Sequence, residues 1–176
     1  TEEYFDSIIQ ASIEVGIKKM SEYGTSWTSY RPGSLLTRML NKGKRVVVLQ
    51  DTGENHVGES IKREFIEILS YAAILGIMTE QNIVLHSQLP PDEVTKYRLA
   101  IFQGAKDIMI KKNHDYGEAW REMEQAEIID EINVKIQRMK CIVKLKQKPN
   151  MDNVYDVINY CAFALILLEE GVHKDI

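Results

Sequence analysis

The sequence is poor in cysteine and proline, and it has no long uninterrupted apolar segment. Two cysteines and four prolines in 176 residues exclude a disulfide framework and a proline-rich linker protein. Cys141 and Cys161 both fall at apolar positions of helical patterns, so we expect reduced, buried thiols. No apolar run approaches the roughly 20 residues of a membrane helix, and no charged-then-apolar leader opens the sequence. We therefore expect a cytoplasmic protein that does not enter a membrane.

Positive charge is also scarce for a protein that binds duplex nucleic acid. There are 22 Lys and Arg residues against 26 Asp and Glu residues, which gives a formal net charge of −4. A chain with this balance repels DNA unless its cations gather on one face. Hydrophobic residues make up 44% of the chain, as in ordinary globular domains. We therefore expect a small molecule as the partner, with a homo-oligomer as a further option.

What the sequence does contain is an internal duplication. At an offset of 93 residues, ten of the 42 positions from 8 to 49 are identical between the two copies. The offset becomes 89 after a loop that is four residues shorter in the second copy. We expect one repeat at residues 1–80, a linker at 81–91 and a second repeat at 92–176, packed as one globular unit. The clearest matches are Tyr23-Gly24-x-x-Trp27 with Tyr116-Gly117-x-x-Trp120, and Lys42-x-x-Arg45 with Lys135-x-x-Arg138.

The hydrophobic periodicity predicts three helices in each copy. In the first copy they span about 4–21, 35–49 and 59–78, and in the second about 92–113, 125–147 and 151–169. Ser34 is the expected cap of the second helix, and Gly24 and Gly117 are expected to end helices with positive φ. Three consecutive valines at 46–48 favour a strand, but they align with a helical segment of the second copy, so we expect helix. The predicted fold is an all-α bundle of about six helices with an internal pseudo-twofold axis.

Two basic pairs are shared by both copies. Lys42 and Arg45 lie three residues apart on one helical face, and Lys135 and Arg138 repeat this spacing. Such a pair can bind an anionic oxygen cluster from two directions, so we predict that these four residues bind phosphate.

A carboxylate stripe ends in a tyrosine on the third helix of each copy. The carboxylates are Glu64 and Glu67 before Tyr71, and Asp152 and Asp156 before Tyr160. Mg²⁺ prefers oxygen ligands and commonly shares its coordination shell with substrate phosphates. The sequence therefore predicts a phosphate site with Mg²⁺ as its cofactor, held by these four carboxylates.

The same charged residues allow a structural interpretation, and the aromatic residues of the Tyr-Gly-x-x-Trp motif allow two roles. Arg138 with Asp156, and Arg45 with Glu67, could be ion pairs that fix the register of neighbouring helices. Trp120, Trp27 and Tyr116 could stack on a base, or the tryptophans could close the end of a bundle.

A third interpretation is a metal-dependent phosphohydrolase of the HD type. The adjacent pair His114-Asp115 resembles the metal-binding signature of that class. His86 upstream and Asp152 or Asp156 downstream would supply the two remaining ligands.

Several of these motifs together resemble a known family. Lys112-x-His114-Asp115-Tyr116-Gly117-x-Ala119-Trp120-Arg121, the Lys135-x-x-Arg138 helix and Asp156-x-x-Asn159-Tyr160 look like the nucleotide modification-associated domain 1 family. The first copy resembles the same domain with drift, since Glu22 replaces the usual Asp and Thr28 the usual Arg. The resemblance covers nearly the whole chain and implies a role beside enzymes that make or modify nucleotides.

A second resemblance concerns mechanism. Glu64-Phe65-Ile66-Glu67 is similar to the E-x-x-D helix of MazG-type all-α NTP pyrophosphatases, whose carboxylates bind Mg²⁺. We therefore expect a protein that handles a nucleotide or another phosphorylated small molecule. Mg²⁺-dependent hydrolysis of a nucleoside triphosphate or modified nucleotide is the catalytic version, and a non-catalytic nucleotide- or partner-binding module is the alternative.

Overall fold

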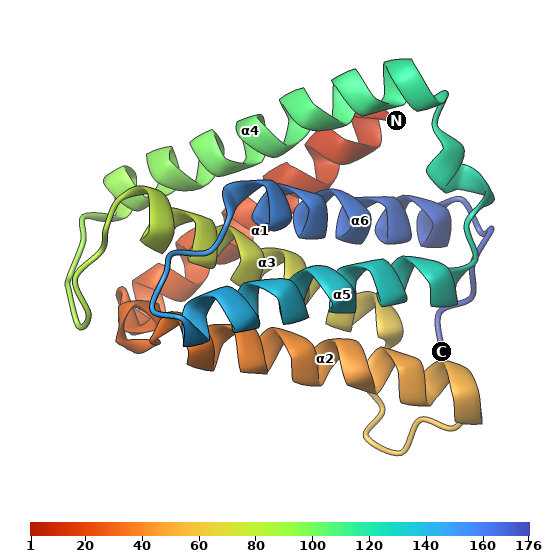
Figure 1. The fold of residues 1–176 in the computed structure, drawn as a ribbon, viewed down its shortest axis with the longest axis horizontal. Coiled ribbons are helices and arrows are strands. Elements are labelled where there is room, and N and C mark those ends of the chain that lie inside the picture. Colours follow the sequence, from red (N-terminus) through yellow and green to blue (C-terminus); the bar gives the residue numbers. More distant parts are fainter.

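The chain folds into six α-helices without a strand (Figure 1). The computed structural model describes residues 1–176. The first repeat contains α1 (Glu2–Tyr23), α2 (Pro32–Thr52) and α3 (Ile61–Glu80), and the second contains α4 (Pro91–Tyr116), α5 (Gln125–Lys144) and α6 (Met151–Glu169). Short 3₁₀ helices, η1 (Ser26–Ser29) and η2 (Ala119–Glu122), follow α1 and α4. The all-α prediction is confirmed, as is the helical state of the three valines within α2.

Four helices form the central bundle: α2 packs on α3 and α5, and α6 packs on the same two helices. The helices α1 and α4 lie against each other, and α4 also covers α6 and α3 (Figure 1). Each helix of the first repeat thus contacts its counterpart in the second: α1 with α4, α2 with α5 and α3 with α6.

The two central helices α3 and α6 run in opposite directions. Lys62 and Ile66, early in α3, share a groove with Leu165 and Glu169, late in α6. The C-terminal segment lies at the same end, because Ile61 donates its backbone N–H to the carbonyl oxygen of Ile176. The N-terminal turns of α3 and α6 therefore lie at opposite ends of the bundle.

The core helix α6 corrects one expectation from the sequence. By length and composition alone it could cross a membrane, although no such segment was expected. In the fold, 61% of that apolar window is buried inside the protein, and its apolar residues fill the centre of the bundle between α3, α4 and α5. The apolar surface of α6 is therefore explained by helix packing.

Local signals at the helix ends explain where the helices begin. Ser60 accepts from the backbone N–H of Arg63 to cap α3, and Asn150 accepts from Asp152 to cap α6. The prediction that Ser34 caps α2 was wrong. Pro32 occupies the first helical turn instead, where its fixed φ suits a helix start and its missing N–H costs no hydrogen bond.

The cysteine prediction was half right. Both cysteines are free, but only Cys161 is buried, whereas Cys141 is exposed. Cys141 lies in the last turn of α5.

Glycines turn the chain sharply after the first helix of each repeat. Gly24 has φ 59° after α1 and Gly117 has φ 61° after α4, so the predicted positive φ is confirmed. A β-carbon would be unfavourable in this conformation. The turns lead directly into η1 and η2, which carry Trp27 and Trp120. The Tyr-Gly-x-x-Trp motif therefore positions one tryptophan per repeat beside the bundle.

Candidate ligand pockets

Two pockets lie at corresponding places in the two repeats. The N-terminal pocket lies between α1, η1 and α3, with a volume of about 250 Å³. The C-terminal pocket lies between α4, η2 and α6, with a volume of about 360 Å³. All eleven residues that line the C-terminal pocket have a counterpart, at the offsets of 93 and 89, that lines the N-terminal pocket. The best-matched pairs are Lys19 with Lys112, Tyr23 with Tyr116, Trp27 with Trp120, Glu67 with Asp156, and Tyr71 with Tyr160.

Aromatic rings form the wall of the C-terminal pocket. Trp120 stacks on Phe163 with ring centroids 4.2 Å apart and 4° between the planes, and Tyr160 meets Phe163 edge-on. The guanidinium of Arg121 covers the other face of Trp120 at 4.6 Å. Because both of its faces are covered, Trp120 is part of the wall, and a base cannot stack on it without displacing Arg121. Tyr116 is 73% exposed at the rim and is the free aromatic ring.

A carboxylate and two lysines form the charged part of the C-terminal site. The carboxylate of Asp156 lies 3.0 Å from Nζ of Lys112 and 3.2 Å from Nζ of Lys135. Lys135 is one of the residues predicted to bind phosphate, whereas Lys112 was not among the predicted site residues. Two lysines and one aspartate leave this cluster with one net positive charge.

Arg138 does not join the C-terminal cluster. The proposed ion pair with Asp156 is not formed, and Arg138 is exposed without an ion pair or side-chain hydrogen bond. The reason lies in the alignment of the repeats. Its counterpart Arg45 binds Glu64, and the residue that corresponds to Glu64 in the second repeat is the neutral Asn153.

In the first repeat the basic pair is fully neutralised. Arg45 binds Glu64 at 2.9 Å, and Lys42 pairs with Glu67 and, at 3.8 Å, with Glu64. The proposed pair of Arg45 with Glu67 is therefore wrong by one helical turn. Arg63 adds ion pairs to Glu59 and Glu67, so three cations meet three carboxylates. This cluster has no charge left over for a phosphate.

The four carboxylates expected to bind metal do not come together. Glu64 and Glu67 begin α3, whereas Asp152 and Asp156 begin α6, at the opposite end of the bundle. Glu64, Glu67 and Asp156 are each paired with Lys or Arg, and Asp152 is exposed. No group of three or more His, Cys, Asp or Glu side chains is placed to hold a metal ion.

The residues of the HD-type interpretation are dispersed in the same way. His114 and Asp115 contact each other on the surface, with 87% and 73% of their side chains exposed. His86 lies in the linker, where it contacts Ser29.

Sequence reasoning did not single out Asn159 as a ligand-binding residue. Its side-chain N–H donates to the carbonyl oxygen of Ala105 at 3.0 Å, and its Oδ1 is buried without a partner. Asn159 lines the C-terminal pocket, so a buried acceptor without a partner lies beside the site. The available signal was an asparagine in an otherwise apolar stretch of α6, beside Tyr160.

The ion pairs of Glu67 make a prediction about acid stability. Burial alone would raise the pKa of Glu67, but hydrogen bonds from Lys42 and Arg63 outweigh it and hold the pKa below its usual 4.5. The ionised carboxylate therefore contributes stability above about pH 4.5, and this contribution disappears as the pH falls through the lowered pKa. In urea unfolding, Glu67→Gln should be less stable than the parent at pH 7, and the difference should shrink at pH 3. The exposed, unpaired Glu22 provides the control, since Glu22→Gln should show no difference at either pH. If the difference in stability between Glu67→Gln and the parent were the same at pH 7 and pH 3, it would contradict the lowered pKa of Glu67.

The fold and the pockets define a duplicated helical domain with one aromatic-walled pocket per repeat. The family model of the nucleotide modification associated domain 1 matches residues 19–79 and 112–168, and the chain belongs to this family. The two matched segments begin at Lys19 and Lys112 and end at Thr79 and Leu168, positions related by the same offsets of 93 and 89, which agrees with tandem copies. No curated protein and no solved structure matches the chain.

Proposed function

We propose that the protein binds a nucleotide in its C-terminal pocket, with the base against the aromatic wall and the phosphates toward Lys112 and Lys135. The observation that carries this proposal is the composition of the pocket, with aromatic rings, a buried acceptor without a partner and Lys112, together with Lys135, which shares the carboxylate of Asp156 with Lys112. Membership of a family associated with nucleotide modification supports the same class of ligand.

The base end of the ligand would lie between Tyr116 and the buried part of the wall. Tyr116 is mostly exposed at the rim and can close over one face of a base. Oδ1 of Asn159 can accept from a ring N–H or an exocyclic amino group, and this contact would satisfy an acceptor that has no partner in the protein. The volume of about 360 Å³ lies at the lower end of the range for small-molecule pockets.

The phosphate end would lie at the two lysines. Lys112 and Lys135 share one carboxylate, so a phosphate can bind there without leaving either lysine unpaired. Arg138, three residues further along α5 and free of any ion pair, is available to a longer phosphate chain. Of the corresponding cations of the first repeat, Lys42 and Arg45 are already neutralised and only Lys19 is free of an ion pair, which favours the second repeat as the working site.

The carboxylates of this chain do not fit the predicted Mg²⁺ ion. Mg²⁺ needs several convergent oxygens in near-octahedral geometry, and the four candidate carboxylates are divided between two ends of the bundle. We therefore derive no step through a metal, and the proposal is a nucleotide-binding module.

The test is a fluorescence titration of the C-terminal pocket. Trp27 and Trp120 are the only tryptophans, so Trp27→Phe leaves Trp120 as the reporter. Nucleoside mono- and triphosphates are added with EDTA or with millimolar Mg²⁺, and pyrophosphate release is followed in parallel. We expect binding that persists in EDTA and weakens with salt, because exposed charges are screened. Lys112→Gln should weaken nucleotide binding about tenfold, and Tyr116→Ala should weaken nucleotide and nucleoside alike.

Two matched controls accompany these variants. Lys111→Gln removes a neighbouring exposed lysine outside the pocket, and Tyr23→Ala removes the counterpart of Tyr116 in the first repeat. Both should retain the parent affinity at Trp120. Absence of any nucleotide response at Trp120 would overturn the proposal, and pyrophosphate release that requires Mg²⁺ would replace the binding module with a hydrolase.

A further inference from the structure

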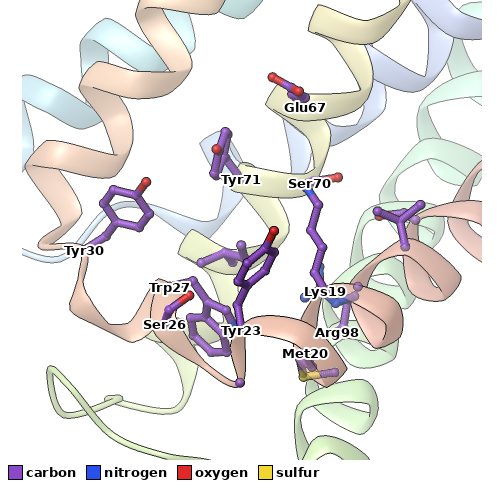
Figure 2. A pocket seen from close by; sticks show the side chains of 15 residues that line it. Lys19, Met20, Tyr23, Ser26, Trp27, Tyr30, Glu67, Ser70, Tyr71 and Arg98 are labelled. Atoms are coloured by element: carbon purple, nitrogen blue, oxygen red, sulfur yellow. The ribbon is translucent and has the colours of Figure 1, made fainter.

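The N-terminal pocket contains a buried cation that the protein leaves without a counter-ion. Arg98 comes from α4, is only 4% exposed and lines this pocket (Figure 2). Its side chain makes no hydrogen bond to the protein, and it belongs to none of the ion pairs. Burial lowers the pKa of Arg98 from its ordinary value, but a guanidinium keeps its proton in proteins. A buried, unpaired charge of this kind is unfavourable until an anion binds to it.

Two further donors in the same pocket lack partners. Oγ of Ser12 and Nε1 of Trp27 are buried without a hydrogen bond, and both residues line the cavity. They come from α1 and η1, whereas Arg98 comes from α4, so donors on three elements border one cavity. The exposed Lys19 adds a second positive charge at its edge.

The one carboxylate of the pocket does not neutralise Arg98. Glu67 is held by Lys42 and Arg63, and in Figure 2 it lies on the opposite side of the cavity from Arg98. The cavity therefore has a cationic end that no residue of the chain neutralises.

Comparison of the two repeats shows that these features are specific to the first one. Ser12 corresponds to Ala105, and Arg98 corresponds to the fully buried Phe5. Gly16 corresponds to Met109, and its missing side chain makes room for Arg98, since a β-carbon there would lie 3.0 Å from Cζ of Arg98.

The two tryptophans also differ between the repeats, in whether their indole N–H has a hydrogen-bond partner. Nε1 of Trp120 donates to Asn113, whereas the counterpart of Asn113 is Met20, which leaves Nε1 of Trp27 free. Each of these differences therefore adds a free donor, or the space for one, to the N-terminal pocket.

We propose that the N-terminal pocket is a binding site for a compact oxyanion, a phosphate ester or a carboxylate of a small ligand, with Arg98 as its principal contact. Ser12 and Trp27 donate the accompanying hydrogen bonds. The site is separate from the C-terminal pocket and does not depend on the function proposed for that pocket.

The test uses Trp27 as the reporter in the Trp120→Phe protein, in which phenylalanine keeps an aromatic ring beside Phe163. Inorganic phosphate, glycerol phosphate and acetate are titrated against sodium chloride of equal ionic strength. We expect an oxyanion to change the Trp27 emission and to raise the melting temperature. A stronger response to the phosphates identifies a phosphate ester as the ligand class, and a stronger response to acetate identifies a carboxylate.

Arg98→Met in this background should weaken oxyanion binding at least tenfold. The same variant without ligand should melt at the parent temperature or above it, because an unpaired buried charge has been removed. If Arg98 only packed against its neighbours, the Arg98→Met variant would melt at a lower temperature than the parent. Should Arg98→Met fail to fold, Ser12→Ala provides the second measurement, with binding weakened severalfold and the melting temperature retained.

The outcomes for the two pockets are separable. In the Trp120→Phe protein, Lys112→Gln should leave the response of Trp27 to oxyanions unchanged. This holds whatever effect Lys112→Gln has on nucleotide binding in the Trp27→Phe protein. No response of Trp27 or of the melting temperature to any oxyanion, or equal affinity in the parent and Arg98→Met, would overturn the proposal.

Discussion

Replacement of Arg45 by alanine should lower the free energy of unfolding by about 3 kcal/mol, because it removes the closest cation of a buried carboxylate. Glu64, its partner, is only 2% exposed, and the nearest remaining cation would be Lys42 at 3.8 Å. Arg45 also binds Asn55 and the carbonyl oxygen of Glu59, so the loop between α2 and α3 would lose an anchor. Urea unfolding followed by circular dichroism measures the loss.

The second repeat provides the matched control for this variant. Arg138 occupies the corresponding position, is exposed and has no partner, so Arg138→Ala should change the free energy of unfolding by less than about 0.5 kcal/mol. The double variant Arg45→Met/Glu64→Leu should recover much of the stability, because it removes the buried carboxylate together with its cation. Equal losses in Arg45→Ala and Arg138→Ala would show that the ion pair with Glu64 has no energetic importance.

Trp120→Ala should lower the free energy of unfolding by about 3–5 kcal/mol, the usual cost of truncating a buried tryptophan. The ring is 6% exposed. Its loss removes the stack on Phe163, the contact with Arg121 and the hydrogen bond to Asn113. Thermal unfolding and urea titration measure this effect without any ligand.

Trp27→Ala is the matched control, with an expected loss below about 2 kcal/mol. Trp27 is half-buried, its N–H has no partner, and neither an aromatic ring nor a cation lies on its faces. The two tryptophans of one motif would then differ in role, with Trp120 closing the bundle and Trp27 free to contact a ligand. A larger loss for Trp27→Ala than for Trp120→Ala would reverse this assignment.

The helices could be predicted from the sequence because their apolar periodicity repeats twice. The three valines of α2 show how the duplication helped, since their own preference is for strands and only the alignment with the second copy indicated a helix. The start of α2 was missed because two signals competed there, and Pro32 defined the first turn ahead of Ser34.

The ion pairs could not be assigned from spacing alone. Arg45 and Lys42 both face α3, and which of them meets Glu64 or Glu67 depends on the axial shift between α2 and α3. The sequence pattern does not specify this shift. The lysine that completes the C-terminal cluster, Lys112, lies on α4, and its closeness to Asp156 is a tertiary contact between helices 44 residues apart.

Arg98 was overlooked although a signal was available. At the offset of 93 it aligns with Phe5, so a charged residue occupies a position that is buried and apolar in the other copy. A charge at such a position must be paired, exposed or functional. The sequence cannot distinguish these three outcomes, because they depend on what the neighbouring helix places opposite the charge.

The contacts between each helix and its own counterpart have an evolutionary consequence. Self-complementary contacts of this kind form the interface of a twofold homodimer of separate chains, and here α1 meets α4, α2 meets α5 and α3 meets α6. Arg98, from the second repeat, completes the pocket of the first, so the repeats are not autonomous units. In a homodimer every substitution would alter both pockets at once. Joining the two units through residues 81–90 uncouples them, so that one pocket can acquire a new ligand while selection preserves the other.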